Sequence, residues 1–186
     1  CLENERDGLV HDYTRRGGVE DTFIVAPEGA EWAQDRSALW NAAEAAEKRK
    51  DAKVAREYEL ALPAELDAGQ RRDLVRAFAE DIRDRYGVAV DAAIHAPHDY
   101  GDDRNHHAHV MTTTRMVDAQ GLGAKTRQLD VRSSASIEVE EIRASWAAQV
   151  NDALELAQVA ERVDHRSYAR QGVEMEPTVK MGHASA

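Results

Sequence analysis

The stretch AIHAPHDYGDDRNHHAHVMTTTR, residues 93–115, contains five of the eight histidines in this 186-residue chain. Alternating apolar residues in the overlapping segment VAVDAAIH, residues 88–95, predict a strand with one apolar face. After a polar loop, residues 105–116 predict a second strand. If the two strands are neighbours in a sheet, their histidines lie close together.

The spacing of these histidines favours a metal site. Residues two apart on a strand project from the same face, so His107 and His109 share a face, and His95 ends the preceding strand. Three neutral imidazoles with open coordination positions can hold a divalent ion that also binds a substrate oxygen. The alternative is that each imidazole is an ordinary surface or hydrogen-bonded side chain. The single cysteine argues against a structural zinc site.

The rest of the chain predicts helices and further strands without an internal repeat or a linker, so a single domain over residues 1–186 is expected. An Asp67 and Gln70 pair resembles a capping box, and Gly87 supplies a helix stop. The sequence predicts strands at 22–27 and 56–63, helices at 31–55, 67–86 and 136–160, a turn at 118–123 and a helical turn at 167–171. This order favours an α/β (α+β) sandwich, with a mainly antiparallel sheet and long helices packed on it.

The composition predicts a globular protein with 42% hydrophobic and 32% charged residues. No apolar run is long enough to span a membrane, and a single cysteine fits a reducing compartment, so the cytoplasm is the expected location. The net charge of −11 argues against general nucleic-acid binding but leaves room for a local basic patch. Trp32, Trp40 and Trp146 lie on apolar helix stripes, which predicts core positions.

Several segments together resemble the MobA/MobL relaxase family, and within it the nickase domains of TraA-type conjugative relaxases. They are AIHAPH…NHHAHVMTTTR, REYELALPAEL, DHRSYARQG…EPTVKMG, GLVHDYTRRGGV, LWNAAEAAEKRKDAKVAREYELALP and GLGAKTRQLD. The resemblance runs over nearly the whole chain. It implies a two-layer sandwich of the HUH endonuclease type, named for its His–hydrophobic–His motif. Ala108 meets the hydrophobic position only in a small form.

The resemblance assigns the metal ligands to His95, His107 and His109, with His95 preferred to His98 because of its AIH context. Mn²⁺ or Mg²⁺ is the favoured cofactor, and Zn²⁺, Ni²⁺ or Co²⁺ is the alternative, because imidazoles accept several divalent ions. In this family a tyrosine attacks a phosphate of single-stranded plasmid DNA at the transfer origin and forms a phosphotyrosyl link.

The resemblance places that tyrosine in an N-terminal segment ahead of Cys1, together with the first strand of the sheet. Tyr13, Tyr100 and Tyr168 do not match the motif of the nucleophilic tyrosine. Each is instead expected to be a packing residue or a polar surface residue. We therefore expect the chain as given to bind metal and DNA but not to nick.

Two carboxylates and five basic residues complete the predicted site. Glu57 and Glu59 project from one strand face, and Tyr58 and Leu60 from the other. Such a carboxylate pair is usually solvated, but the resemblance places Glu59 above all near the active centre, to accept the tyrosine proton or orient a histidine. Asp91 shares the face of His95 but ranks lower. The candidates for phosphate contacts are Arg15, Arg16, Arg115, Lys125 and Arg127.

The expected partners are the plasmid transfer origin and accessory proteins of the relaxosome, in a bacterial cytoplasm and without membrane insertion. Two other hypotheses stay open. A rolling-circle replication initiator shares the same type of metal site. A non-catalytic metal-binding or partner-binding module would explain the acidic charge without any DNA chemistry.

Overall fold

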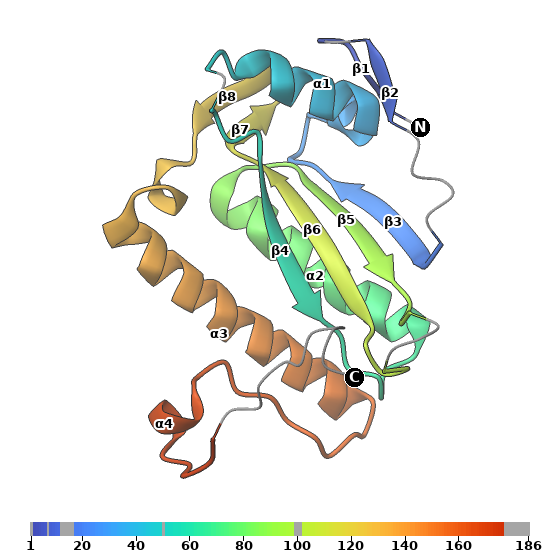
Figure 1. Ribbon diagram of the computed structural model, residues 1–186, viewed down its shortest axis with the longest axis vertical. Helices are drawn as coiled ribbons and strands as arrows, with labels where there is room; N and C mark the ends of the chain where they lie inside the picture. The colour runs from blue at the N-terminus through green and yellow to red at the C-terminus, as the bar shows by residue number, and fades with distance from the viewer. Residues whose placement is uncertain (1, 7, 12–16, 50, 99–101, 177–186) are drawn as a thin grey trace, which may run out of the picture.

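A four-stranded sheet, in which every neighbouring pair of strands is antiparallel, forms the centre of the computed structural model (Figure 1). In spatial order its strands are β3 (Val19–Val25), β5 (Val90–His95), β6 (His107–Thr113) and β4 (Ala55–Ala61). The structure describes residues 2–6, 8–11, 17–49, 51–98 and 102–176. The two strands of the histidine-rich stretch are the central ones, which confirms that they are neighbours.

One face of this sheet carries the main hydrophobic core. Val90, Ala92 and Ile94 of β5 are buried on it, next to Ala108 and Val110 of β6. Because every second side chain of a strand projects to the same face, the apolar alternation in the sequence places this set on one side. The intervening residues, among them the histidines, project to the opposite face.

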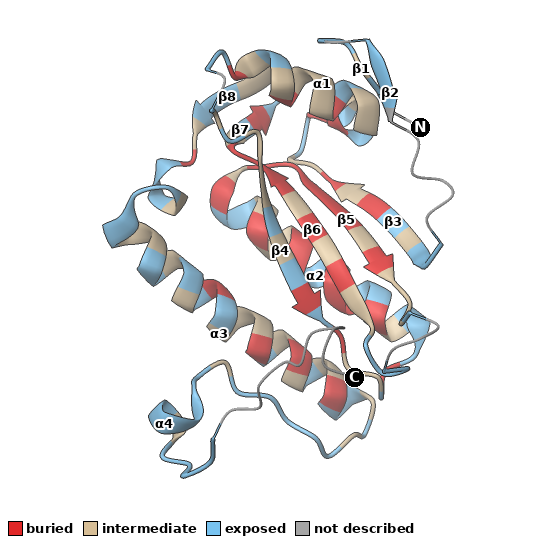
Figure 2. Cartoon of the chain, in the orientation of Figure 1, coloured by how far each residue is buried: buried red, intermediate tan, exposed pale blue. Residues whose placement is uncertain are grey.

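Two long helices, α2 (Ala68–Tyr86) and α3 (Arg132–Leu156), cover the apolar face. Phe78 of α2 is fully buried, and the Trp146 ring of α3 meets it edge-on with ring centres 5.3 Å apart. Figure 2 shows the buried residues gathered in the strands and along the inner sides of these helices. The predicted fold, an antiparallel sheet with long helices packed on it, is confirmed.

The ends of α2 follow from local sequence. The Asp67 side chain accepts a hydrogen bond from the Gln70 backbone N–H at 2.8 Å, and the Gln70 side chain accepts one from the Asp67 N–H at 2.9 Å. This capping box pairs N–H groups that a helix start otherwise leaves unpaired. At the other end Gly87 has a φ of 64°, a left-handed conformation that glycine adopts without a steric penalty. Both predictions are confirmed.

Described elements cover the opposite face of the sheet at the end where β5 begins. The covering elements are η1 (Glu31–Gln34), α1 (Arg36–Ala46) and a hairpin of β7 (Arg115–Asp118) and β8 (Gly121–Lys125). Asp91 fixes α1 to the sheet, because it accepts two hydrogen bonds from Arg36 at 2.8 Å and one from the Trp40 indole at 2.9 Å. At the other end, where β5 stops and β6 starts, none of the helices and strands that the structure describes covers this face.

Four short elements complete the chain: β1 (Leu2–Asn4), β2 (Leu9–His11), η2 (Arg127–Leu129) and α4 (Tyr168–Gln171). The first two pair as a separate hairpin, and α4 lies beside α3. In the part of the chain that the structure describes, no helix is long and apolar enough to cross a membrane.

The helix predicted over residues 31–55 is wrong in extent. A 3₁₀ turn comes first, Asp35 then caps α1 by accepting a hydrogen bond from the Ala38 N–H at 2.9 Å, and α1 ends at Ala46. The next residue, Glu47, has an extended backbone and a buried side chain that pairs with the β7–β8 hairpin. Tertiary pairing therefore overrides the helix propensity of the Ala- and Glu-rich sequence. The predicted turn at 118–123 joins β7 to β8, and β8 begins within it at Gly121 and ends at Lys125.

Candidate functional site

Three imidazoles meet on the open face of the sheet, at the end of β5 and the beginning of β6. His95 and His107 are directly opposite one another in the β5–β6 register, and His109 follows two residues later on β6. The ring centres lie 5.2 Å apart for His95 and His107, 5.1 Å for His95 and His109, and 5.4 Å for His107 and His109. The sequence expectation that these three side chains converge agrees with this geometry.

The distances between the three rings suit a shared metal ion, but the orientation of the His95 and His107 rings does not. Imidazoles that bind one ion at about 2.0–2.1 Å have ring centres roughly 5 Å apart. The His95 and His107 rings are stacked with an angle of 13° between their planes, so their nitrogens do not point at one place. Accordingly, no three His, Cys, Asp or Glu side chains among the described residues form a ready metal site. The donor set fits a divalent ion once these rings rotate about their side-chain bonds.

The hydrogen bonds of two rings already set the tautomer that a metal ligand needs. His107 Nδ1 lies 2.9 Å from the Asn105 carbonyl oxygen, and His109 Nδ1 lies 2.7 Å from Glu57 Oε1. A carbonyl or carboxylate oxygen accepts, so each Nδ1 carries a proton, and in the neutral ring Nε2 is then the nitrogen that can bind a metal ion. Metal-binding histidines in proteins commonly donate their second nitrogen in this way.

The third ring, His95, is favoured in its neutral form. Its partial burial lowers the pKa of the imidazole, and the charges of His107 and His109 lower it further. A neutral imidazole is the form that binds a metal ion.

The two predicted carboxylates occupy different places beside these rings. Glu57 contacts His109 directly, whereas Glu59, which the sequence ranked first, lies opposite His109 in the β4–β6 register and is exposed. Tyr58 projects to the other face and packs edge-on against Phe78, with ring centres 5.9 Å apart, as the alternation predicts. The Asn105 carbonyl was missed because a backbone contact leaves no signal in the side-chain pattern.

The predicted phosphate-binding residues are not gathered around the histidines. Arg115 and Lys125 lie at the opposite end of the sheet, where they pair with the two oxygens of Glu47 at 2.8 Å and 2.6 Å (Figure 1). Burial by itself raises the pKa of the Glu47 carboxyl, but hydrogen bonds from Lys125 and Arg115 and their charges outweigh it, so the pKa lies below its ordinary value. Arg127 is exposed in η2, and Arg15 and Arg16 lie outside the described residues.

The tyrosines that the structure describes do not reach the three histidines. Tyr86 donates a hydrogen bond to Glu138 at 2.7 Å in the helix layer, and Tyr168 begins α4 beside α3. Burial and the hydrogen bond to Glu138 raise the pKa of Tyr86, which suits a packing role. Tyr13 and Tyr100 lie outside the described residues.

Both sequence and structure match proteins of plasmid transfer. The model of the MobA/MobL family matches residues 1–186. The chain is 39% identical to the mobilization protein MobL of Acidithiobacillus ferridurans over 100% of this chain and 55% of that protein. It is 34% identical to the conjugal transfer protein TraA of Agrobacterium fabrum (strain C58), over 97% of this chain but 18% of that protein. The chain thus spans about half of one relative and under a fifth of the other.

A solved structure supports the same comparison. It comes from work on the molecular basis of vancomycin resistance transfer in Staphylococcus aureus. The two structures superpose with a TM-score of 0.76 at 27% sequence identity, over 90% of this chain and 85% of the other.

Proposed function

Because this chain belongs to the MobA/MobL family, we propose that it is the DNA-nicking domain of a conjugative relaxase. In this proposal the enzyme cuts one strand of plasmid DNA at the transfer origin. A tyrosine hydroxyl attacks the phosphorus, the 5′-phosphate becomes linked to the tyrosine, and the 3′-hydroxyl leaves. The names of its relatives, mobilization protein and conjugal transfer protein, support a role in plasmid transfer.

The convergence of His95, His107 and His109 on an open face is the observation that carries this proposal. These three imidazoles would hold a divalent ion, Mn²⁺ or Mg²⁺ above all, which would supply Lewis-acid polarisation of the phosphate oxygens and positive charge beside phosphorus. The half-exposed position of the rings leaves room for a phosphodiester to approach from solvent.

The neighbouring carboxylates are assigned two different tasks. Glu57 holds His109 in the Nδ1-protonated tautomer, so it positions a ligand. Glu59 is exposed on the same face, one strand away from His109, and is the candidate base for the tyrosine proton. A tyrosine with an ordinary pKa of about 10 is a weak nucleophile at neutral pH, so such activation is needed. Tyr58, Tyr86 and Tyr168 are not candidates, because they lie away from the histidines.

The proposed partners are single-stranded DNA of the transfer origin and accessory proteins of the relaxosome, in a bacterial cytoplasm. Arg127, which is exposed, is a better candidate for a phosphate contact than Arg115 or Lys125, and Arg15 and Arg16 stay candidates from the sequence. Arg115 and Lys125 are held by Glu47, so breaking those pairs would oppose their binding to DNA.

Titration of Mn²⁺ into the protein tests the metal site, with His107→Ala as the variant and His106→Ala as its neighbour control. His107 begins β6 and stacks on His95, whereas His106 directly precedes the strand and by alternation projects to the other side. We expect one bound ion per chain, lost in His107→Ala and retained in His106→Ala.

A second experiment tests whether the site binds DNA. Binding of a single-stranded transfer-origin oligonucleotide is measured with and without Mn²⁺ in the wild type, His107→Ala and His106→Ala. We expect binding that Mn²⁺ strengthens in the wild type and in His106→Ala but not in His107→Ala. Negligible binding under all conditions would contradict the relaxase proposal and favour a non-catalytic module.

A further inference from the structure

Strand β3 pairs with β5 beside the histidine cluster, and its register changes there. Over most of its length the pairing advances by one residue on each strand, and Thr22 lies opposite Ala93. Continued by two residues toward the start of β3, the same steps would put Glu20 opposite His95. The observed partner of His95 is Val19 instead, so Glu20 is the extra residue of a β-bulge.

The shifted register continues on the far side of the bulge. The Ala96 N–H donates to the Gly18 carbonyl at 2.8 Å, in the step that follows the pair of Val19 and His95. Backbone pairs therefore lie on both sides of Glu20, which makes the bulge a built part of β3 rather than a frayed end. Bulges are common next to active sites, where they redirect side chains.

The bulge leaves the carboxylates of β3 on the side of the helix layer. Asp21 pairs with Arg72 of α2. Burial lowers the pKa of His106, which projects to the helix side, and the charge of Glu20 opposes this shift. Among the described residues, the pKa of His95 is lowered by burial and by the two neighbouring imidazoles, and Glu20 has no part in it. The Glu20 carboxylate therefore acts on the helix side of the sheet and not on the histidine cluster.

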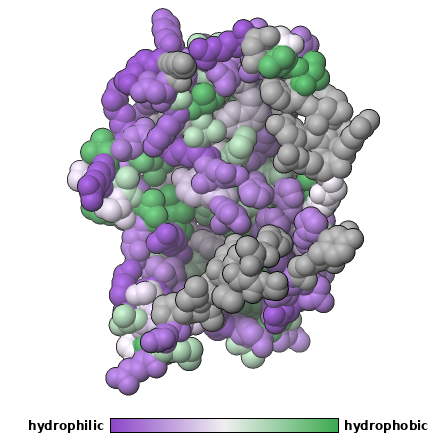
Figure 3. All heavy atoms as spheres, in the orientation of Figure 1, coloured by the Kyte–Doolittle hydropathy of each residue, from purple (hydrophilic) through white to green (hydrophobic). Residues whose placement is uncertain are grey.

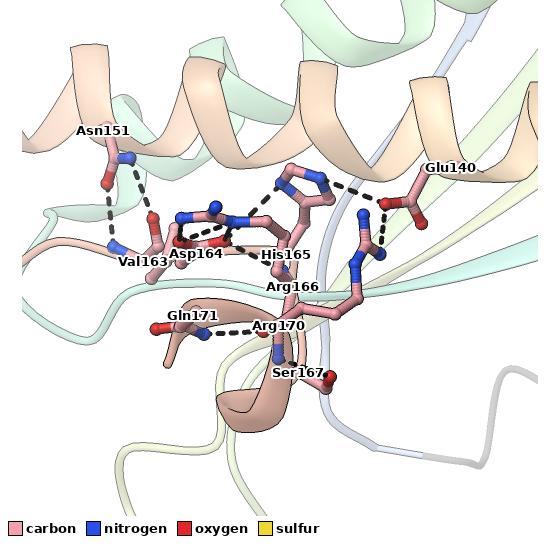
Figure 4. Close-up of polar contacts among 9 residues, drawn as sticks. All are labelled: Glu140, Asn151, Val163, Asp164, His165, Arg166, Ser167, Arg170 and Gln171. Atoms are coloured by element: carbon pink, nitrogen blue, oxygen red, sulfur yellow. Dashed lines mark hydrogen bonds and ion pairs between the residues drawn. The ribbon is translucent and has the colours of Figure 1, made fainter. Parts of the chain in front are cut away.

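Another histidine of this acidic chain does lie between two carboxylates. Asp and Glu outnumber Lys and Arg by 35 to 24, and hydrophilic residues dominate the surface shown in Figure 3, so carboxylates are plentiful beside polar groups. Figure 4 shows His165 with its Nε2 at 3.4 Å from Glu140 and its Nδ1 at 3.8 Å from Asp164. Both nitrogens of that ring face a carboxylate, whereas β3 places an apolar residue, Val19, opposite His95.

The charge of the proposed metal site gives this difference a consequence. Glu57 bonds His109, and Glu59 lies opposite His109, so β4 already brings two negative charges to the histidine face. These two charges balance the two positive charges of a divalent ion. A third carboxylate opposite His95 would make the site net negative, because the Cβ atoms of directly opposite residues lie only about 4.5–5.5 Å apart. A net negative site repels the phosphate backbone of DNA.

We propose that the β-bulge at Glu20 determines what this site can bind. It puts Val19 in the place of a carboxylate beside the cluster, so that a bound ion keeps enough positive charge to attract a DNA phosphate. The inference rests on the proposed function, because it takes the three histidines to bind a metal ion next to DNA. The strand pairs that support it are formed within the described part of the chain.

Two deletions of one residue each test the proposal, because both remove the bulge. Deletion of Val19 brings Glu20 opposite His95, whereas deletion of Glu20 keeps a valine there. In the first variant Mn²⁺ should bind about ten-fold more tightly, because Mn²⁺ readily accepts a carboxylate ligand. The strengthening of oligonucleotide binding by Mn²⁺ should fall at least about ten-fold in the same variant. The second variant should match the wild type in both respects.

The readouts are calorimetric titration with Mn²⁺ and binding of the single-stranded transfer-origin oligonucleotide with and without Mn²⁺. They are expected to move in opposite directions, which a damaged site would not produce. Val19→Glu, with Val19→Gln as its control, repeats the comparison at constant chain length in case a deletion disturbs β3. The glutamate variant should behave like the deletion of Val19, and the glutamine variant like the wild type.

Three results would overturn the proposal. One is equal behaviour of the two deletion variants while the wild type binds both Mn²⁺ and DNA, which would leave the proposed function intact. Another is a joint loss of Mn²⁺ and DNA binding in Val19→Glu but not in Val19→Gln, which would show that this position shapes the site without tuning its charge. The third is a wild type that binds no Mn²⁺, which would contradict the proposed metal site as well.

Discussion

Two polar clusters lie at opposite ends of the same sheet and differ in how completely their groups are paired. In the Glu47 cluster (Glu47, Arg115 and Lys125) the carboxylate is only 6% exposed, and each of its oxygens has its own cationic partner. In the histidine cluster (His95, His107 and His109) the rings are half-buried, and within the described residues His107 and His109 form their hydrogen bonds through Nδ1. A closed cluster serves the fold, whereas an open one leaves nitrogens available for a ligand.

Removal of Glu47 should break the closed cluster with the largest effect on stability. Glu47→Gln leaves Arg115 and Lys125 largely buried without their anion, which should cost about 3–5 kcal/mol of unfolding free energy. Chemical denaturation measures this loss. Mn²⁺ affinity should change less than about two-fold, because the histidines lie at the other end of the sheet. A loss of Mn²⁺ binding in a still folded variant would contradict the separation of the two clusters.

Removal of one imidazole should show the reverse pattern. His107→Ala should weaken Mn²⁺ binding more than about 100-fold, because it deletes one of three ligands. The unfolding free energy should change by less than about 0.5 kcal/mol, since the ring is half-exposed and stacks on another half-exposed ring. Calorimetric titration and denaturation of the same sample give both numbers. Equal affinity in the variant would remove His107 from the site.

The two carboxylates of β4 provide a finer test within the open cluster. Glu57→Gln should weaken Mn²⁺ binding about ten-fold through the loss of the charged partner of His109. Glu59→Gln should leave Mn²⁺ binding within about two-fold, because the carboxylate that bonds His109 is that of Glu57. If Glu59→Gln weakened Mn²⁺ binding more than Glu57→Gln did, the result would instead favour the sequence-based ranking, which puts Glu59 first.

The smallest of the expected effects is a contribution of the Glu47 cluster to the pH dependence of the unfolding free energy. The pKa of Glu47 lies below its ordinary value of 4.5 because Lys125 and Arg115 outweigh its burial. A carboxyl with a lowered folded pKa binds fewer protons folded than unfolded, so its stabilisation is present above pH 4.5 and is lost as the pH falls through the folded pKa. Unfolding measured between about pH 3 and 6 should therefore decline less steeply in Glu47→Gln than in the wild type. Parallel declines would contradict the assignment.

Local signals made most of the fold predictable. The Asp67 capping box, the Gly87 stop and the alternation in β4 and β5 depend on residues a few positions apart, so the sequence alone indicates them. The end of α1 was not predictable, because Glu47 is directed inward by Arg115, which lies 68 residues away. Distant pairing of this kind leaves no periodic pattern.

The candidate site divides in the same way. Strand alternation placed the three histidines on one face, and the neighbouring positions of β5 and β6 brought them together. Glu59 lies opposite His109 in the strand register, but it is Glu57 that bonds it. The contact depends on side-chain conformations along β4, which residue spacing does not determine. Likewise, the sequence gives no sign that Arg115 forms an ion pair with Glu47, and this pair makes Arg115 unsuited to bind DNA.

The most direct test of the account is anomalous X-ray scattering from crystals of this protein grown with Mn²⁺. We predict a single strong peak at the ends of β5 and β6, within about 2.3 Å of one nitrogen from each of His95, His107 and His109. A peak at any other place, or no peak while the His95 and His107 rings stay stacked, would contradict the proposal that these imidazoles share one ion.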